Sequence, residues 1–270
     1  MKPIDLVIFT DLDGTLLDQT HYGYQASLPA IRRVQSRNIP LILCSSKTRH
    51  EMEPLWRELD LKDPFIVENG GAIYFLPDTF PFSIEHAELR DELKRLPLGQ
   101  PIDRLRHVLL EEARRVEAKV QFFTGMTPAR VAELTGLSPH QVLAASQREF
   151  DEPFVVESNQ ENLLALLSSR GYTISRGDRF HHVSHGSDKG KATRVVLDLL
   201  RRMNPALRSV GLGNSANDLP LLRVVDQPIL VRNPDLSWDE IVAQQLPTVR
   251  KTARIGPEGW REAIEEILAA

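Results

Sequence analysis

Two carboxylates one residue apart, close to the N-terminus, are the residues of this sequence best suited to chemistry. Asp11 and Asp13 follow the apolar run at 6–9 and precede Gly14, which allows the chain to turn. Side chains at i and i+2 of an extended segment point to the same side, so both acids can face one ligand. Asp-Gly is also a common surface turn. Because open α/β sheets bind ligands at the carboxyl ends of their strands, a buried strand leading into these acids favours a site.

Other polar residues occupy the same kind of position, at the end of an expected strand or the start of an expected helix. They are Ser45, Ser46, Lys47, Lys189, Asn214, Asn217 and Asp218. Taken alone, a serine there is usually a helix cap and a lysine is usually solvated. Four strand ends or helix starts, widely separated in the sequence, therefore carry polar side chains.

The elements that must position these residues alternate between strand and helix. Strands are expected at 6–9, 39–44, 65–68, 72–76, 210–213 and 228–231, with helices at 28–38, 52–59, 188–200 and 257–268. This order predicts an α/β fold with a doubly wound, parallel, Rossmann-like sheet.

The character of the chain changes from about residue 82 to residue 184. Helices are expected there at 86–96, 101–117, 127–135, 138–150 and 160–170, and strands at 119–123, 154–157, 172–176 and 179–183. We therefore predict a core formed by 1–83 and 185–270 that carries an inserted α+β cap at 84–184.

Composition narrows the function classes. The 270 residues carry a formal charge of -4 and 41% hydrophobic residues, so there is no basic surplus for a nucleic-acid backbone. The single cysteine, Cys44, excludes an internal disulfide and fits a reducing compartment. No run has the length of a membrane span and no signal-peptide pattern opens the chain. We expect a cytoplasmic protein that acts on a small molecule, and nothing in the sequence specifies its oligomeric state.

The set and order of these polar residues resemble the haloacid dehalogenase superfamily of phosphatases over the whole chain. The resemblance implies that Asp11 attacks phosphorus to form an aspartyl phosphate and that Asp13, protonated in the substrate complex, protonates the leaving oxygen. Ser45 would donate a hydrogen bond to the phosphate, and Lys189 would offset charge and hold the nucleophile. It also implies a Mg²⁺ ion with these ligands: Asp11, Asp13 through its backbone carbonyl, Asn214 and Asp218.

Shorter motifs are similar to the mannosyl-3-phosphoglycerate phosphatase branch of that superfamily. They lie at 44–49, 68–71, 148–154, 179–182, 188–192 and 256–260. The resemblance implies hydrolysis of mannosyl-3-phosphoglycerate to mannosylglycerate, with substrate contacts from Ser46, Lys47, Asn69, Gly70, Arg148, Arg176, Arg179 and Asn217. Arginine suits the carboxylate and phosphate of such a substrate, although any one of these arginines can equally form a surface ion pair.

One departure from that branch concerns the metal. Asn214 stands where the family usually has a metal-binding aspartate, and its amide supplies an oxygen but no charge. We expect either Mg²⁺ binding weaker than in relatives or a larger contribution of Asp218 to that binding. The alternatives are a glucosyl-3-phosphoglycerate or broader sugar phosphatase, and a weakened pseudo-phosphatase that only binds its ligand.

Four rival interpretations fit the spacing less well. A cysteine phosphatase needs five residues between Cys44 and an arginine, but Arg49 follows after four. The glycine pattern at 211–216 comes too late in the chain for a dinucleotide-binding turn, and Gly14 comes too early for an EF-hand. His181 and His182 are adjacent in an expected strand and therefore point to opposite faces, which argues against a shared metal ion.

Overall fold

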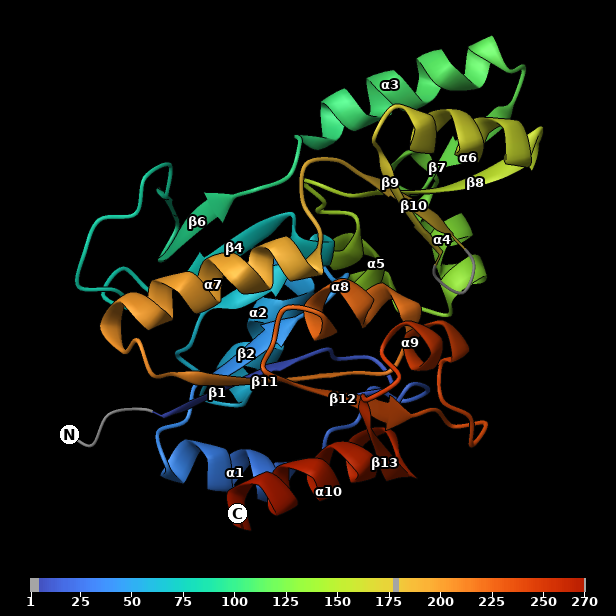
Figure 1. Cartoon of the computed structure of the whole chain (residues 1–270). Coiled ribbons are helices and arrows are strands. Elements are labelled where there is room, and N and C mark those ends of the chain that lie inside the picture. The colour runs from blue at the N-terminus through green and yellow to red at the C-terminus, as the bar shows by residue number, and fades with distance from the viewer. Residues whose placement is uncertain (1–4, 177–179, 270) are drawn as a thin grey trace.

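The computed structural model describes residues 5–176 and 180–269, and Figure 1 shows its arrangement. A nine-stranded sheet has the order β13-β12-β11-β1-β2-β3-β4-β6-β5. Its strands are β1 (Leu6–Thr10), β2 (Leu41–Cys44), β3 (Phe65–Val67), β4 (Ala72–Phe75), β5 (Glu88–Arg90), β6 (Leu93–Pro97), β11 (Arg208–Gly213), β12 (Gln227–Arg232) and β13 (Arg250–Ile255). From β13 to β3 each neighbouring pair is parallel, which confirms the predicted doubly wound sheet.

Helices cover both faces of this sheet (Figure 1). They are α1 (Leu28–Ser36), α2 (Arg49–Glu58), α7 (Lys189–Met203), α8 (Leu219–Leu222), α9 (Glu240–Gln245) and α10 (Gly256–Ala269). Consecutive residues of β1 alternate between two hydrophobic cores: Ile8 packs with α1, α2 and α10, whereas Val7 and Phe9 pack with α7, α8 and α9. A strand buried on both faces reads as the continuous apolar run seen in the sequence.

A second, four-stranded antiparallel sheet lies beyond the carboxyl edge of the first, at the upper right of Figure 1. Its order is β7-β8-β10-β9, and its strands are β7 (Lys119–Phe122), β8 (Glu152–Ser158), β9 (Thr173–Arg176) and β10 (His181–Ser184). The helices of this unit are α3 (Ile102–Arg115), α4 (Pro128–Thr135), α5 (Pro139–Ala145) and α6 (Gln160–Ser169). We call residues 102–184 the cap.

Two helix predictions in this region are wrong. Residues 86–96, expected to be helical, form the hairpin β5–β6, and β6 pairs with β4 at the edge of the nine-stranded sheet. The apolar residues Leu89, Leu93 and Leu96 have helical spacing, but pairing with β4 and the left-handed Asp91 (φ 55°) decide the conformation. The helix expected at 138–150 ends at Ala145, where the chain turns to enter β8.

Because of the β5–β6 hairpin, the cap begins later in the chain than the predicted residue 84. Because β5 and β6 extend the nine-stranded sheet, the first part of the predicted 84–184 insertion belongs to the core layer. No helix within the described ranges has the length and apolarity needed to cross a membrane.

Candidate active site

The predicted site residues lie where the strands next to β1 end. β1 is paired with β11 on one side and β2 on the other, so their carboxyl ends share one edge. Asp11 follows β1, Ser45 follows β2 and Asn214 follows β11. Three segments far apart in the sequence therefore converge because the sheet is parallel.

Lys189 forms the centre of the site. Its ammonium nitrogen lies 2.6 Å from Asp11 Oδ1 and 2.6 Å from Asp218 Oδ1, and its side chain is only 1% exposed. Burial alone would lower the pKa of Lys189, but the two carboxylates outweigh burial and raise it. The lysine therefore stays charged and holds the two acids together.

The pKa of Asp11 is also raised, but for a carboxyl group this shift favours the uncharged form. Burial and the nearby charges of Asp218 and Asp13 raise the pKa of Asp11 to about 7, while Lys189 works against that shift. One lysine thus offsets only part of the negative charge at this position. An additional cation beside Asp11 would favour its charged, nucleophilic form.

Asp13 lies near enough to Asp11 for its charge to act on that carboxyl group, and it forms an ion pair with Lys47. Lys47 Nζ is 2.8 Å from Asp13 Oδ2, and Asp13 Oδ1 is buried without a hydrogen-bond partner. The protonation of Asp13 in a substrate complex stays a prediction. Because Asp13 Oδ1 has no partner, it can form a hydrogen bond with a substrate atom.

Ser45 is buried and its hydroxyl oxygen accepts a hydrogen bond from the Lys47 backbone N–H at 3.2 Å. A hydroxyl that accepts one bond still carries its own O–H donor. Its predicted role as a phosphate donor is therefore compatible with this contact.

The oxygens near Asp11 suit a hard divalent cation. In the part of the chain that the structure describes, no three His, Cys, Asp or Glu side chains form a metal cluster. Mg²⁺, however, is commonly held by one or two carboxylates together with neutral oxygens, waters and substrate phosphate. The Asp11 carboxylate, the Asp13 carbonyl and the Asn214 amide oxygen are donors of this kind, and their binding of a metal stays a prediction. Burial is the main cause of the raised pKa of Asp11; the negative charges of Asp218 and Asp13 add to it, and a cation would offset these charges.

Asp218 and Asn214, two of the four predicted metal residues, already have hydrogen-bond partners within the chain. Asp218 Oδ1 accepts from Lys189, and its Oδ2 accepts from the backbone N–H groups of Asn214 and Ser215. Asp218 therefore anchors Lys189, and metal binding by its side chain stays a prediction. Asn214 Oδ1 accepts from Thr15 at 3.2 Å, and its amide nitrogen donates to Asn233 Oδ1 at 2.8 Å.

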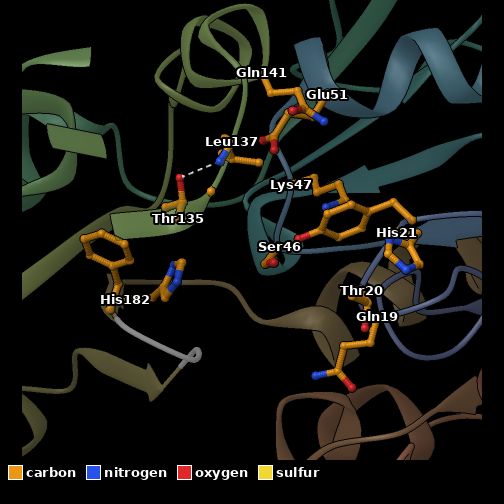
Figure 2. A pocket seen from close by; sticks show the side chains of 13 residues that line it. Gln19, Thr20, His21, Ser46, Lys47, Glu51, Thr135, Leu137, Gln141 and His182 are labelled. Atoms are coloured by element: carbon orange, nitrogen blue, oxygen red, sulfur yellow. Dashed lines mark hydrogen bonds between the residues drawn. The ribbon is translucent and has the colours of Figure 1, made fainter. Parts of the chain in front are cut away.

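A cavity of about 620 Å³ lies between the core and the cap (Figure 2). Asp11, Asp13 and Lys189 are not among the described residues that line it, but Lys47, which contacts Asp13, is. The core lines it with residues 19–22, Ser46, Lys47 and Glu51, and the cap lines it with residues 135–137, Gln141, Phe180 and His182. Two of the predicted substrate residues, Ser46 and Lys47, thus border the cavity.

Five of the six remaining predicted substrate residues divide into three groups. Asn69 and Asn217 are hydrogen-bonded to each other at 3.0 Å. Arg176 is exposed on β9, and Arg179 lies outside the described residues. Gly70 is buried against the backbone of Asp188, where it serves packing.

Arg148, predicted to bind substrate, has partners within the chain, and substrate binding by this residue stays a prediction. Its side chain is 5% exposed; Nε donates to the Asp151 carbonyl at 3.0 Å and Nη2 donates to the Ser46 carbonyl at 2.8 Å. Its guanidinium connects the cap to the loop after β2. The sequence could not distinguish this internal role from anion binding, because both use the same guanidinium donors.

Two acids that the sequence analysis did not single out complete the junction with the cap. Buried Glu68 accepts the backbone N–H groups of Glu149, Phe150 and Asp151. Burial raises the pKa of Glu68 to about 7, although Arg148 lowers it. Asp151 accepts from Asn69 at 2.9 Å and lies 3.1 Å from His182 Nδ1. Both acids lie in motifs noted in the sequence, at 68–71 and 148–154, but the sequence does not indicate these contacts, because the partners are distant in the chain.

Gly70 provides a sharp test of this junction. It has φ +95°, and a Cβ there would lie 2.1 Å from the Asp188 carbonyl oxygen. We expect Gly70→Ala to lower the free energy of unfolding by about 4 kcal/mol, because backbone must move. Gly136→Ala is the matched control: its φ is +75°, but no atom lies within 4 Å of an added Cβ. Only the left-handed backbone conformation is then unfavourable for alanine, and the free energy of unfolding should fall by about 1 kcal/mol. Urea unfolding of both variants measures the difference, and equal losses would contradict the steric argument.

Cys44 supports the rejection of a cysteine phosphatase. The thiol is buried, and burial raises its pKa to about 12. A thiol in this state is not a nucleophile at neutral pH.

Comparisons with known proteins show a similarity to phosphatases. A family model described as haloacid dehalogenase-like hydrolase matches residues 8–87. The chain is 36% identical to a glucosyl-3-phosphoglycerate/mannosyl-3-phosphoglycerate phosphatase of Methanococcoides burtonii, over 97% of each protein. It is 34% identical to a mannosyl-3-phosphoglycerate phosphatase of Pyrococcus furiosus, over 83% of this chain and 90% of that protein. A solved phosphatase of the same superfamily from Bacteroides thetaiotaomicron has a similar fold, with a TM-score of 0.67 at 18% identity over 100% of this chain and 97% of that one.

Proposed function

The chain belongs to the haloacid dehalogenase superfamily, within its glucosyl-/mannosyl-3-phosphoglycerate phosphatase family, and we propose that it hydrolyses mannosyl-3-phosphoglycerate to mannosylglycerate and phosphate. As a member it is a phosphoric monoester hydrolase. The observation that carries the proposal is the Lys189 ammonium 2.6 Å from Asp11 at the carboxyl edge of the sheet. This contact leaves Asp11 Oδ2 as the oxygen that can attack phosphorus.

In the first step, Asp11 Oδ2 forms a bond to phosphorus and the bond from phosphorus to the ester oxygen breaks. Asp13, protonated beforehand, gives its proton to the departing alkoxide, so that mannosylglycerate leaves as a neutral alcohol at that oxygen. In the second step Asp13 takes a proton from water as the water oxygen bonds to phosphorus. The bond between phosphorus and Asp11 then breaks, which releases phosphate and restores the carboxylate.

The surrounding residues orient the two acids and stabilise the negative charge that both steps involve. Lys189 stays protonated and fixes Asp11, Ser45 donates to a phosphate oxygen, and Lys47 orients Asp13. Mg²⁺, when bound through Asp11, the Asp13 carbonyl and Asn214, would neutralise negative charge on the transferring phosphoryl group.

The choice of mannosyl-3-phosphoglycerate as the proposed substrate rests on the names of the relatives. The Methanococcoides burtonii protein is named for both the glucosyl and the mannosyl ester, so the glucosyl ester is the second candidate. Phosphate release from mannosyl-3-phosphoglycerate, glucosyl-3-phosphoglycerate, mannose 6-phosphate and p-nitrophenyl phosphate, each with Mg²⁺, tests the proposal. A kcat/KM at least tenfold higher for the mannosyl ester supports it. Equal rates for all four would indicate a broad phosphatase, and no release from any would indicate a binding protein.

Asn214→Asp tests the metal site. The added charge should lower the Mg²⁺ concentration for half-maximal activity by about tenfold, because charged ligands bind Mg²⁺ more tightly than an amide oxygen. The carboxylate introduced by this substitution would meet Asn233 Oδ1, so the Asn233 amide must turn over to donate to it. Mg²⁺ titrations of phosphate release measure the effect, with thermal unfolding as a check on the fold. Unchanged Mg²⁺ dependence and unchanged turnover would show that Asn214 is not a ligand.

A further inference from the structure

His182 lies on the cap side of the cavity, across from Ser46 and Lys47 in Figure 2. Its Nδ1 is 3.1 Å from both oxygens of Asp151, a carboxylate with no exposed surface. A carboxylate at Nδ1 keeps the proton on that nitrogen and orients the ring, as in other acid–histidine pairs. Because Nδ1 is occupied in this way, Nε2 is the ring atom available to a ligand.

The contacts of Asp151 fix this pair relative to the phosphate site. Asp151 also accepts from Asn69 at 2.9 Å and lies 3.4 Å from Arg148 Nη2, which donates to the Ser46 carbonyl. Burial opposes ionisation of Asp151, but His182 and Arg148 prevail and lower its pKa. The imidazole is therefore held over the cavity by a buried negative charge that is itself tied to the loop carrying Ser45 and Ser46.

The charges around the cavity show which part of a substrate His182 can meet. Among the described lining residues, three can carry positive charge: His21, Lys47 and His182. Lys47 is engaged by Asp13 at the phosphoryl end, and His21 is an exposed loop residue. His182 is the one of the three that the cap supplies, and it has a buried carboxylate behind it.

We propose that His182, oriented by Asp151 and protonated on both ring nitrogens in the substrate complex, binds the carboxylate of the glycerate group through Nε2–H. The inference deepens the proposed function and rests on it, since it assigns one cap residue to one anionic group of that substrate. The substrate class that this arrangement selects is a phosphate ester with a carboxylate near the phosphate. It replaces Arg148, whose guanidinium is used internally, as the cap group for anion recognition.

The test compares His182→Gln with His181→Gln. His181 is the adjacent residue on the other face of β10, where Nε2 contacts Gln160 at 3.2 Å. With His182→Gln, kcat/KM for mannosyl-3-phosphoglycerate relative to p-nitrophenyl phosphate, which has no carboxylate, should fall ~10- to 100-fold, mainly through KM, as expected for one lost charge-assisted hydrogen bond. His181→Gln should leave that ratio within twofold of the wild type. An unchanged ratio in His182→Gln, or an equal fall in His181→Gln, would overturn the inference.

A binding measurement separates this inference from the proposed function. In an Asp11→Asn background, calorimetry gives the Kd of mannosyl-3-phosphoglycerate without turnover, and adding His182→Gln should weaken it by the same ~10- to 100-fold. If the wild-type chain hydrolyses neither ester but His182→Gln still weakens binding, the proposed function fails and the inference stands. If hydrolysis is normal but the Kd does not change, the inference fails and the function stands.

Discussion

Asp11→Asn should lower kcat for phosphate release by about 10⁴-fold or more, as expected for removal of a nucleophile. An amide at this position cannot form the acyl phosphate, whereas the shape of the side chain is nearly unchanged. Lys189 would keep its contact with Asp218, so the fold should survive. Stopped assays with radiolabelled phosphate ester would then show a labelled, acid-stable and base-labile protein only for the wild-type chain.

Asp60→Asn is the matched control for that substitution. Asp60 undergoes the same chemical change, but its side chain is 87% exposed and lies outside the site, so turnover should equal that of the wild type. Retention of more than a tenth of the wild-type kcat by Asp11→Asn would eliminate the covalent route. A metal-activated water attacking phosphorus directly would then have to replace it.

Lys189→Met should have the second large effect, on both stability and activity. The ammonium is buried between two carboxylates at 2.6 Å, and its removal leaves their charges facing each other without compensation. Removing one partner of a buried ion pair typically lowers the free energy of unfolding by about 3–5 kcal/mol. Turnover should fall by about 10²- to 10³-fold, because a fixed charge near the transferring group is lost. Urea unfolding and phosphate release at saturating Mg²⁺ measure the two losses.

The double variant Lys189→Met/Asp218→Asn separates the two effects. Removing the second carboxylate charge should recover most of the stability, since only Asp11 then carries charge in the cluster. Activity should stay low, because nothing replaces the ammonium beside the nucleophile. If the double variant were as unstable as Lys189→Met, packing of the long lysine side chain would be the cause of the loss.

In the cap, the sequence predicts most helices but not the roles of individual side chains. The amphipathic pattern of the sequence predicts α3, α4 and α6, because the apolar residues of these helices follow the helical period. The same period misassigned the β5–β6 hairpin, since a short edge element is decided by its partner strand. Cap residues that line the cavity are the least predictable, because side-chain direction decides which residues face it. Arg148 turned inward to Ser46 and Asp151, while His182, weighed in the sequence only as a metal ligand, faces the cavity.

The sequence by itself determined the parallel core and the residues at its edge. A buried strand that runs into Asp11 and Asp13 can place them only at a carboxyl end, and polar residues after later strands of the same sheet must meet them there. Only the tertiary structure decided the partners of these residues: which carboxylates Lys189 would bridge, and that Glu68 and Asp151 would join core to cap. The physical reason is that strand direction and burial are encoded locally, by composition and period. Contacts between buried charges depend on the packing of segments more than a hundred residues apart in some cases, such as Asp11 and Lys189.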